Sequence, residues 1–432
     1  MRLLPSLAAS AALLVALLTH AHPASATNVL KYAGVNLSGA EFNSSAKPGV
    51  LYQNYVYPSD SDFAYYASKG MNVVRLPFLW ERLQPSAGAS LDATQLSYIR
   101  TAVTRAKNHG ITVILDPHNY AKYYGNRIGT SAVPNTVFAD LWRQLSKQFA
   151  NDPAVIFGLM NEPYGIDAVT WSRSAQAAIT AIRGTGAKNL ILVPGVSWTG
   201  AHSWTNAGAG GGTSNGDALV AITDPANKVA FEVHQYLDSD YSGTHSTCVS
   251  TSIGAEKLKS FTDWLRAHQK IGFLGEFGAA ANSTCLVSLD NMLAYMETNA
   301  DVWLGWSYWA GGPWWGDYMF SVQPNSNGTA KPQMSILADR ARAVTSAKPV
   351  VAPTSTPPHI MISQPSRSKQ SSRPTGASAA ASQSKISAAP VAAGRPASTA
   401  PAASASSSPR KLVPRQVLTE AKHKGRWRML AD

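Results

Sequence analysis

The chain has 432 residues, of which 45% are hydrophobic, and a formal net charge of +12. A charge of this size is typical of nucleic-acid-binding proteins, but residues 343–432 alone hold 13 of the 37 Lys and Arg residues and only two acidic residues. Residues 27–342 hold 23 basic and 23 acidic residues, which argues against nucleic acid as a partner of the predicted folded part.

The first 26 residues have the features of a signal peptide. Arg2 precedes a long Leu/Ala-rich stretch, and residues 24–26 read Ala-Ser-Ala, the small-x-small sequence that signal peptidase cleaves. A membrane anchor is the alternative, but Pro, Ser and His residues interrupt the apolar stretch. No second apolar run approaches the roughly 20 residues of a membrane-spanning helix. We therefore expect a secreted, extracellular protein without a membrane span, whose mature chain begins at Thr27.

Apolar runs rich in β-branched residues recur through residues 27–342. There are eight of them, at 32–37, 73–78, 112–118, 155–161, 190–194, 229–236, 272–277 and 303–309. Segments of helical length lie between most of them, among them 92–109, 135–150, 169–183 and 255–269. Strands that alternate with helices predict a parallel sheet, and near-continuous apolar strands predict burial on both faces. Eight such strands predict an α/β fold, a single (β/α)8 TIM barrel over residues 27–342.

The carboxyl ends of these predicted strands are unusually polar. They carry Asn36, Arg75, His118, Asn119, Asn161, Glu162, His234, Tyr236, Glu276 and Trp309. Active sites of (β/α)8 barrels are built at that end of the strands, so we expect these side chains to line one site.

Two glutamates stand out among these residues. Glu162 and Glu276 each follow a run of apolar residues and so lie at the rim of a predicted core. A pair of carboxyl groups at one site predicts acid/base and nucleophilic chemistry of the kind that glycoside hydrolysis uses. Nothing in the sequence requires a metal or another cofactor.

Six motifs, in this order, resemble glycoside hydrolase family 5, the cellulase-type clan of retaining (β/α)8 hydrolases. They are Asn72-Val-Val-Arg-Leu-Pro-Phe78, Leu115-Asp-Pro-His-Asn-Tyr120, Met160-Asn-Glu-Pro163, Val233-His-Gln-Tyr236, Leu274-Gly-Glu-Phe-Gly278 and Gly305-Trp-Ser-Tyr-Trp309. The resemblance covers about residues 31 to 340 and is greatest to the endo-β-1,4-glucanases. It implies an enzyme that hydrolyses a β-1,4-linked polysaccharide such as cellulose.

The resemblance also implies a role for each acid. Glu162 would be the general acid/base and Glu276 the nucleophile of a double displacement. Arg75 and Tyr236 would lie beside Glu276, where a positive charge and a hydroxyl donor keep it ionised. Retention requires the two carboxyl groups to be roughly 5 to 5.5 Å apart, against about 6.5 to 9.5 Å in an inverting pair.

Three further polar residues have roles that the resemblance implies. Asn161 would bind the sugar 2-hydroxyl, and His118 and His234 would donate hydrogen bonds within the same polar network. For the histidines the alternative is an ordinary core residue with satisfied hydrogen bonds. Four acids next to predicted strands, namely Glu81, Asp116, Glu232 and Asp238, are expected instead to cap helices, pair with Arg or face solvent.

Twelve tryptophans are available to stack on sugar rings, although core packing is the alternative for each of them. By the family pattern, Trp309 would form the floor of the cleft beside the cleaved bond. We expect Trp80 and Trp198 to contact sugars at more distant subsites.

Cys248 and Cys285 are the only cysteines in the chain. An exported protein meets an oxidising compartment, so we expect a disulfide between the loops that follow strands six and seven. Two unpaired buried thiols are the alternative, and a zinc site is disfavoured because no His residues have suitable spacing.

Residues 343–432 are rich in Ala, Ser and Pro and are expected to be disordered. Residues 347–409 resemble the linkers that join secreted cellulases to a cellulose-binding module. Only about 20 residues follow, so either the module is missing from this chain or the basic end binds an acidic surface. We expect the protein to be a monomer.

Two alternatives to the glucanase reading stay open in the sequence. An endo-β-1,4-mannanase or a xyloglucanase would use the same two glutamates, because loops outside the motifs decide the substrate. A barrel that binds polysaccharide without cleaving it would keep the cleft, but loss of catalysis usually leaves a gap in the set of catalytic residues.

Overall fold

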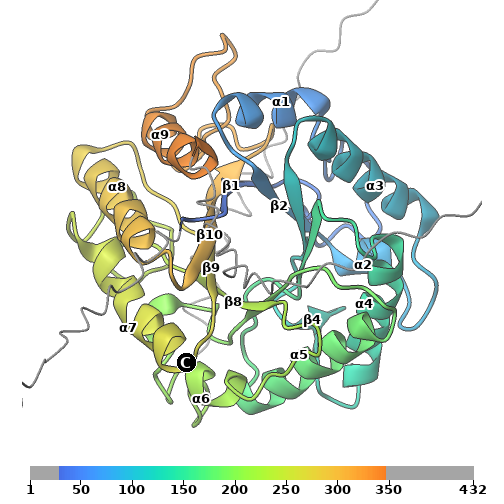
Figure 1. The fold of residues 1–432 in the computed structure, drawn as a ribbon. Coiled ribbons are helices and arrows are strands. Elements are labelled where there is room, and N and C mark those ends of the chain that lie inside the picture. The colour runs from blue at the N-terminus through green and yellow to red at the C-terminus, as the bar shows by residue number, and fades with distance from the viewer. Residues whose placement is uncertain (1–28, 347–432) are drawn as a thin grey trace, which may run out of the picture. The chain divides into compact units, whose positions relative to one another are not determined.

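The structure is a computed structural model that describes residues 29–346. The predicted signal peptide and residues 347–432 lie outside the described residues. Eight parallel strands close into a barrel in the order β1-β10-β9-β8-β7-β6-β3-β2 (Figure 1). Their bounds are β1 Tyr32–Leu37, β2 Val73–Phe78, β3 Thr112–Pro117, β6 Val155–Gly158, β7 Ile191–Pro194, β8 Val229–His234, β9 Gly272–Glu276 and β10 Trp303–Gly311. The predicted (β/α)8 barrel is confirmed.

Helices form a ring outside the barrel strands in Figure 1. The longer ones are α1 Asp60–Ser68, α3 Ala93–Asn108, α4 Asn135–Gln148, α5 Ala168–Arg183, α7 Ile253–Ala267, α8 Ser283–Thr298 and α9 Gln333–Ser346. Shorter elements lie in the connections, namely α2 Trp80–Leu83, η1 Ala201–Ser203, α6 Asn215–Leu219 and the hairpin of β4 Lys122–Tyr123 and β5 Asn126–Arg127. None of the helices in residues 29–346 is long and apolar enough to cross a membrane.

Side-chain caps explain where several of these helices begin. The side chain of Asp92 accepts a hydrogen bond from the Gln95 amide at the start of α3, and Asp167 accepts one from the Thr170 amide at the start of α5. Such caps satisfy backbone donors that have no partner within the helix. The last helix, α9, continues to Ser346, so the folded part extends past the boundary predicted at residue 342.

Four of the eight barrel strands end earlier than the apolar runs predicted. Strand β3 ends at Pro117, β6 at Gly158 and β8 at His234, while the runs were expected to reach His118, Asn161 and Tyr236. The difference has one physical reason: the polar residues at these ends leave the ladder and turn over the rim of the barrel. That turn places them at the candidate site.

The interior of the barrel is built in layers. Its floor is an apolar cluster of Tyr32, Val73, Ile114, Ile156, Leu192, Ala230 and Phe273. Side chains two residues apart on a strand point to the same face, so the next layer holds the side chains two positions further on. That layer contains Arg75, Asp116 and Glu232, which we call the ionic layer, and the glycines Gly158 and Gly275.

A disulfide joins Cys248 to Cys285, with an S–S distance of 2.02 Å and a Cα–Cα distance of 5.3 Å. Cys248 lies in the loop after β8. Cys285 lies in the first turn of α8 and not in the loop before it, because that helix begins directly after Asn282, whose side chain accepts a hydrogen bond from the Cys285 amide. The bond therefore ties the loop after β8 to a helix.

Candidate active site

Glu276 is the last residue of β9 and is fully buried. Its Oε1 accepts a hydrogen bond from Arg75 Nη1 at 2.9 Å, and its Oε2 accepts one from the Tyr236 hydroxyl at 2.9 Å. Burial and the charge of Glu276 raise the pKa of Tyr236 well above its usual value, so the phenol stays a hydrogen-bond donor. Both oxygens of Glu276 are thus held by donors that favour a carboxylate.

The loop after β8 holds Tyr236 in this position. Gly243 has a φ of 68°, which favours glycine. A Cβ atom there would lie 2.5 Å from a Tyr236 ring carbon. The glycine therefore lets the loop pack directly on the tyrosine ring.

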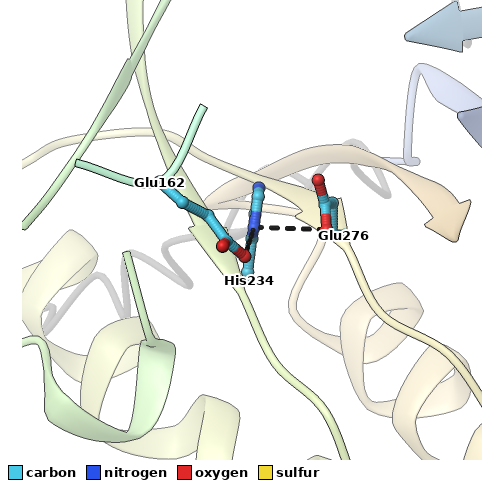
Figure 2. Close-up of side chains that lie close together, drawn as sticks. All are labelled: Glu162, His234 and Glu276. Carbon is cyan, nitrogen blue, oxygen red and sulfur yellow. Dashed lines mark hydrogen bonds and ion pairs between the residues drawn. The ribbon is translucent and has the colours of Figure 1, made fainter. Parts of the chain in front are cut away.

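Glu162 lies in the loop after β6 and is 5% exposed. Its φ of 39° is in the left-handed region, which residues other than glycine seldom adopt and which clusters at functional sites. Its Oε1 lies 2.9 Å from His234 Nδ1, and that nitrogen is 3.7 Å from Glu276 Oε2. Figure 2 shows His234 between the two glutamates.

The two glutamates, which we call the catalytic pair, come close together in space. One carboxylate oxygen of Glu162, one of Glu276 and a ring nitrogen of His234 all lie within 4.8 Å of one another. The two acids are far apart in the sequence, and strands β6 and β9 are not neighbours in the barrel. The closed barrel brings their carboxyl ends to one site.

The fully buried guanidinium of Arg75 joins the ionic layer to the catalytic pair. Besides Glu276, it forms ion pairs with Asp116 at 3.1 Å and with Glu232 at 3.0 Å. Burial alone would lower the pKa of Arg75, but the charges of Asp116, Glu232 and Glu276 raise it. One cation therefore faces three carboxylates.

Two amide side chains complete the contacts of Arg75. Asn36 Oδ1 accepts from Nη1 at 3.0 Å, and Asn161 Oδ1 accepts from Nη2 at 2.9 Å. The amide nitrogen of Asn161 lies 3.1 Å from His118 Nε2, and His118 Nδ1 lies 2.8 Å from Asp116 Oδ2. These contacts assign the proton of His118 to Nδ1, and they fix the Asn161 amide from both ends.

His234 is bound differently. Its Nδ1 faces Glu162, and its Nε2 lies 3.4 Å from Glu232 Oε1. Burial alone would lower its pKa, but the charge of Glu276 and hydrogen bonds to Glu162 and Glu232 raise the pKa of His234 to about 9. At neutral pH the ring is therefore an imidazolium that donates from both nitrogens.

The tryptophans predicted at the site have different environments. Trp309, in β10, stacks on His118 with ring centroids 5.5 Å apart and an interplanar angle of 16°. Trp198 is partly exposed and stacks on Tyr164 at 5.2 Å. Their contacts with sugar stay predictions.

The prediction for Trp80 is wrong. Its side chain is completely buried, packs on Tyr123 and Phe138, and donates its indole hydrogen bond to Gln84. Trp80 begins the short helix α2, which directs the ring into the core. Trp80 is part of the core below the site, and none of its surface is accessible to a sugar.

Asp116 and Glu232 pair with Arg75, which is one of the three outcomes expected for them, but sequence reasoning missed that this pairing makes them part of the site. Each lies two residues before a site histidine on the same strand face, and that acid-x-His spacing was the signal available. Glu81 and Asp238 do not face solvent either, because both are buried and hold loops. Glu81 accepts hydrogen bonds from Asn119 and the Tyr124 amide, and Asp238 accepts backbone amides of its own loop.

A further buried acid, Glu41, follows β1 and was also missed. Its carboxylate accepts hydrogen bonds from the Ser38 hydroxyl and, at 2.8 Å, from the Gly39 amide. Burial raises the pKa of Glu41, and the neighbouring His118 partly opposes that effect. The hydrogen bonds from Ser38 and Gly39 show that Glu41 stabilises the loop after β1.

Glu162, His234 and Glu276 are also residue types that bind metal ions. Here His234 Nδ1 donates to Glu162, and Arg75 and Tyr236 donate to Glu276. Hydrogen bonds therefore account for the arrangement of these side chains. That the protein works without a metal or cofactor stays a prediction.

Comparisons with known proteins show the family of this chain. The model of the family described as Cellulase (glycosyl hydrolase family 5) matches residues 33–312. Endo-beta-1,4-glucanase B of Aspergillus niger is 41% identical over 304 residues, which are 70% of this chain and 88% of that protein.

Solved structures give the same result. An endo-beta-1,4-glucanase from Xanthomonas axonopodis pv. citri is 59% identical, with a TM-score of 0.72 over 73% of this chain and 100% of that one. XacCel5A in complex with cellopentaose is 58% identical, with a TM-score of 0.71 over 72% and 99%. The resemblance inferred from the six motifs is confirmed. The chain belongs to glycosyl hydrolase family 5, the cellulase family, and is a glycoside hydrolase.

Proposed function

We propose that this protein is a retaining endo-β-1,4-glucanase that hydrolyses internal β-1,4 bonds of cellulose or related β-glucans. The observation that carries the proposal is the catalytic pair, whose oxygens approach within 4.8 Å. Retaining pairs are roughly 5 to 5.5 Å apart, whereas inverting pairs need about 6.5 to 9.5 Å to admit a water molecule. The names of the Aspergillus niger and Xanthomonas relatives, and the cellopentaose complex, support the substrate.

In the first step, a carboxylate oxygen of Glu276 attacks the anomeric carbon. The bond from that carbon to the departing oxygen breaks, and Glu162 gives its proton to this oxygen. The products are a glycosyl ester on Glu276, an ionised Glu162 and a free chain end. Arg75 and Tyr236 keep Glu276 ionised and oriented before the attack.

In the second step, ionised Glu162 takes a proton from water, and the water oxygen attacks the anomeric carbon. The ester bond breaks, Glu276 leaves as a carboxylate, and Glu162 again carries its proton. Two inversions at one carbon give net retention. The Asn161 amide donates its second N–H to the sugar 2-hydroxyl in both steps, and its contacts with Arg75 and His118 support this role.

The assay that tests the roles compares Glu276→Gln and Glu162→Gln with the unchanged protein on carboxymethylcellulose. Loss of the nucleophile should lower kcat on the order of 10⁴-fold or more, and loss of the acid/base about 10² to 10⁴-fold. Glu256→Gln, on an exposed position of α7, is the matched control and should keep full activity. Full activity in either catalytic variant would refute the role assigned to it.

The substrate is tested by running the same assay on mannan and on xyloglucan. We expect cleavage of carboxymethylcellulose to be fastest. Activity on mannan alone would assign the protein to the mannanases, and binding of cellulose without any product would assign it to non-catalytic barrels. The intact set of Arg75, Asn161, Glu162, Tyr236 and Glu276 argues against the last outcome.

We also propose that the protein is exported and that its mature chain starts at Thr27. The support is the Arg2 and Ala24-Ser-Ala26 pattern at the N-terminus. N-terminal sequencing of protein from the culture medium tests it. Recovery of the activity only inside cells would contradict export.

The basic residues of 343–432 are proposed to bind an acidic surface such as pectic wall material, because their charge is not balanced by acids. Co-sedimentation of the full chain with pectin and with cellulose tests this, since binding to pectin should weaken with added salt. The protein is proposed to act as a monomer, which light scattering on the full chain would test.

A further inference from the structure

Glu232 is a buried carboxylate that the mechanism above does not use. It lies on β8, two residues before His234, and is 1% exposed. Its Oε1 is 3.0 Å from Arg75 Nε and 3.4 Å from His234 Nε2. A single carboxylate oxygen thus contacts both cations that adjoin the catalytic pair.

The barrel has a space shaped for this carboxylate. A Cβ atom on Gly275 would lie 2.1 Å from Glu232 Oε1 and 2.8 Å from its Cδ and Cγ. Gly275 is not among the glycines with positive φ, so its backbone conformation would tolerate a side chain. What requires glycine here is the space that Glu232 fills, directly before the nucleophile Glu276.

Charge balance explains what Glu232 does to its neighbours. Arg75 alone faces the carboxylates of Asp116, Glu232 and Glu276, and uncompensated buried charge is strongly destabilising. A second cation at His234 offsets part of this excess. The charged groups that face His234 are Glu162 from the loop after β6, Glu276 from β9 and Glu232 on its own strand.

The direction of the His234 ring follows from the same contacts. With Nε2–H directed to Glu232, Nδ1–H points at Glu162, and the Nδ1 atom lies 3.7 Å from Glu276 Oε2 (Figure 2). A charged donor at this place stabilises the anion that forms on Glu162 when its proton leaves. The same donor remains beside Glu162 while it waits to act as a base.

We propose that Glu232 is a positioning residue, which acts through His234 by holding it as an imidazolium with Nδ1–H directed between Glu162 and Glu276. The proposal deepens the proposed function and rests on it for the catalytic meaning of the pair. The state of His234, however, can be measured without substrate, so the two proposals can fail separately.

The experiment is a ¹⁵N-histidine NMR titration of the full chain, with His234 assigned by His234→Gln. In the unchanged protein, both ring nitrogens of His234 should stay protonated through pH 8. A normal titration midpoint near 6.5 would overturn the proposal without any variant being made.

Glu232→Gln keeps the shape of the side chain and removes its charge. We expect the midpoint of the His234 titration to fall by at least about one pH unit, because an opposite charge at this distance typically shifts a pKa by about 1 to 3. We expect kcat near pH 8 to fall roughly tenfold with KM little changed, the loss expected for one hydrogen bond to a charged group.

Asp116→Asn is the matched control. It removes a charge of the same sign, also from an ion pair with Arg75, but its histidine partner is His118. The His234 midpoint should stay in place in this variant. An unchanged midpoint in folded Glu232→Gln, or equal shifts in both variants, would refute a specific role of Glu232.

Gly275→Ala gives a second route to the same result if Glu232→Gln does not fold. Its added methyl should displace the Glu232 carboxylate and lower the His234 midpoint while Glu232 itself is retained. A folded Gly275→Ala protein with the unchanged His234 midpoint would contradict the account of the glycine.

Discussion

Two acid–histidine units flank Arg75, and they share a sequence spacing but differ in chemistry. Asp116 and His118 come from β3, whereas Glu232 and His234 come from β8, and both acids form ion pairs with the same guanidinium. The second nitrogen of His118 meets the Asn161 amide. The second nitrogen of His234 meets a carboxylate, Glu162.

That difference decides what each unit can do. The Asn161 amide next to His118 lets the ring serve as a hydrogen-bond acceptor that orients this amide. Three carboxylates around His234 turn the same ring into a second cation, whose pKa is about 9. Identical spacing in the sequence therefore yields two histidines with different partners, and the residue that each ring meets in the loop after β6 makes the difference.

The largest effect is expected from a substitution that removes the cation shared by both acid–histidine units. Arg75→Met leaves Asp116, Glu232 and Glu276 without their shared partner, and loss of one partner of a buried ion pair costs about 3 to 5 kcal/mol. Urea unfolding measures this change. Arg266→Met, which removes an exposed ion pair with Asp301, should cost less than about 1 kcal/mol, and an equal loss in both variants would contradict the role of the ionic layer.

A smaller effect, the pH dependence of the free energy of unfolding, distinguishes His234 from His118. The pKa of His234 is raised to about 9 in the folded protein, against about 6.5 when unfolded. The stabilisation this provides is fully present below pH 6.5 and is lost as the pH rises to 9. It amounts to about 3 kcal/mol. Urea unfolding at several pH values measures it.

His234→Gln should remove this decline between pH 6.5 and 9. His118→Gln should leave the decline in place, because His118 faces one carboxylate and one amide. If the unchanged protein and His234→Gln lose stability in parallel over that range, His234 is not the second cation.

The smallest effect concerns the His118 unit alone. Asp116→Asn should loosen the orientation of His118 and hence of Asn161. It should lower kcat/KM roughly threefold to tenfold, the loss expected when the neutral hydrogen bond from Asn161 to the sugar is weakened. Aryl cellobiosides with and without a 2-hydroxyl on the ring at the cleaved bond provide the measurement. The loss should be confined to the hydroxylated substrate; the same loss on both would mean that Asp116 does not act through Asn161.

Much of the fold could be predicted because its signals are local. Eight apolar runs with helical segments between them specify a barrel, and the polar residues at the run ends mark the rim that carries the site. The motifs around Glu162 and Glu276 identified the family, and the roles proposed for these residues follow from that resemblance. The distance between the Glu162 and Glu276 carboxyl groups depends on closure of the barrel, and no local sequence pattern predicts that distance.

The ionic layer could not be predicted for a different reason. In the sequence, Asp116 and Glu232 look like the acids that hold loops, such as Glu81 and Asp238. Only the packing of side chains inside the barrel shows that the first two face Arg75, while the others accept hydrogen bonds from loop residues. The prediction for Trp80 was wrong for a similar reason. The sequence of a loop does not show whether a short helix such as α2 turns the indole of Trp80 into the core.

The configuration of the first product tests the central claim most directly. ¹H NMR of the reducing end formed from a cello-oligosaccharide, recorded before mutarotation, distinguishes the two possible anomers. The catalytic pair, with oxygens within 4.8 Å, predicts that the β-anomer appears first. Initial formation of the α-anomer would contradict an account in which Glu276 attacks the sugar itself.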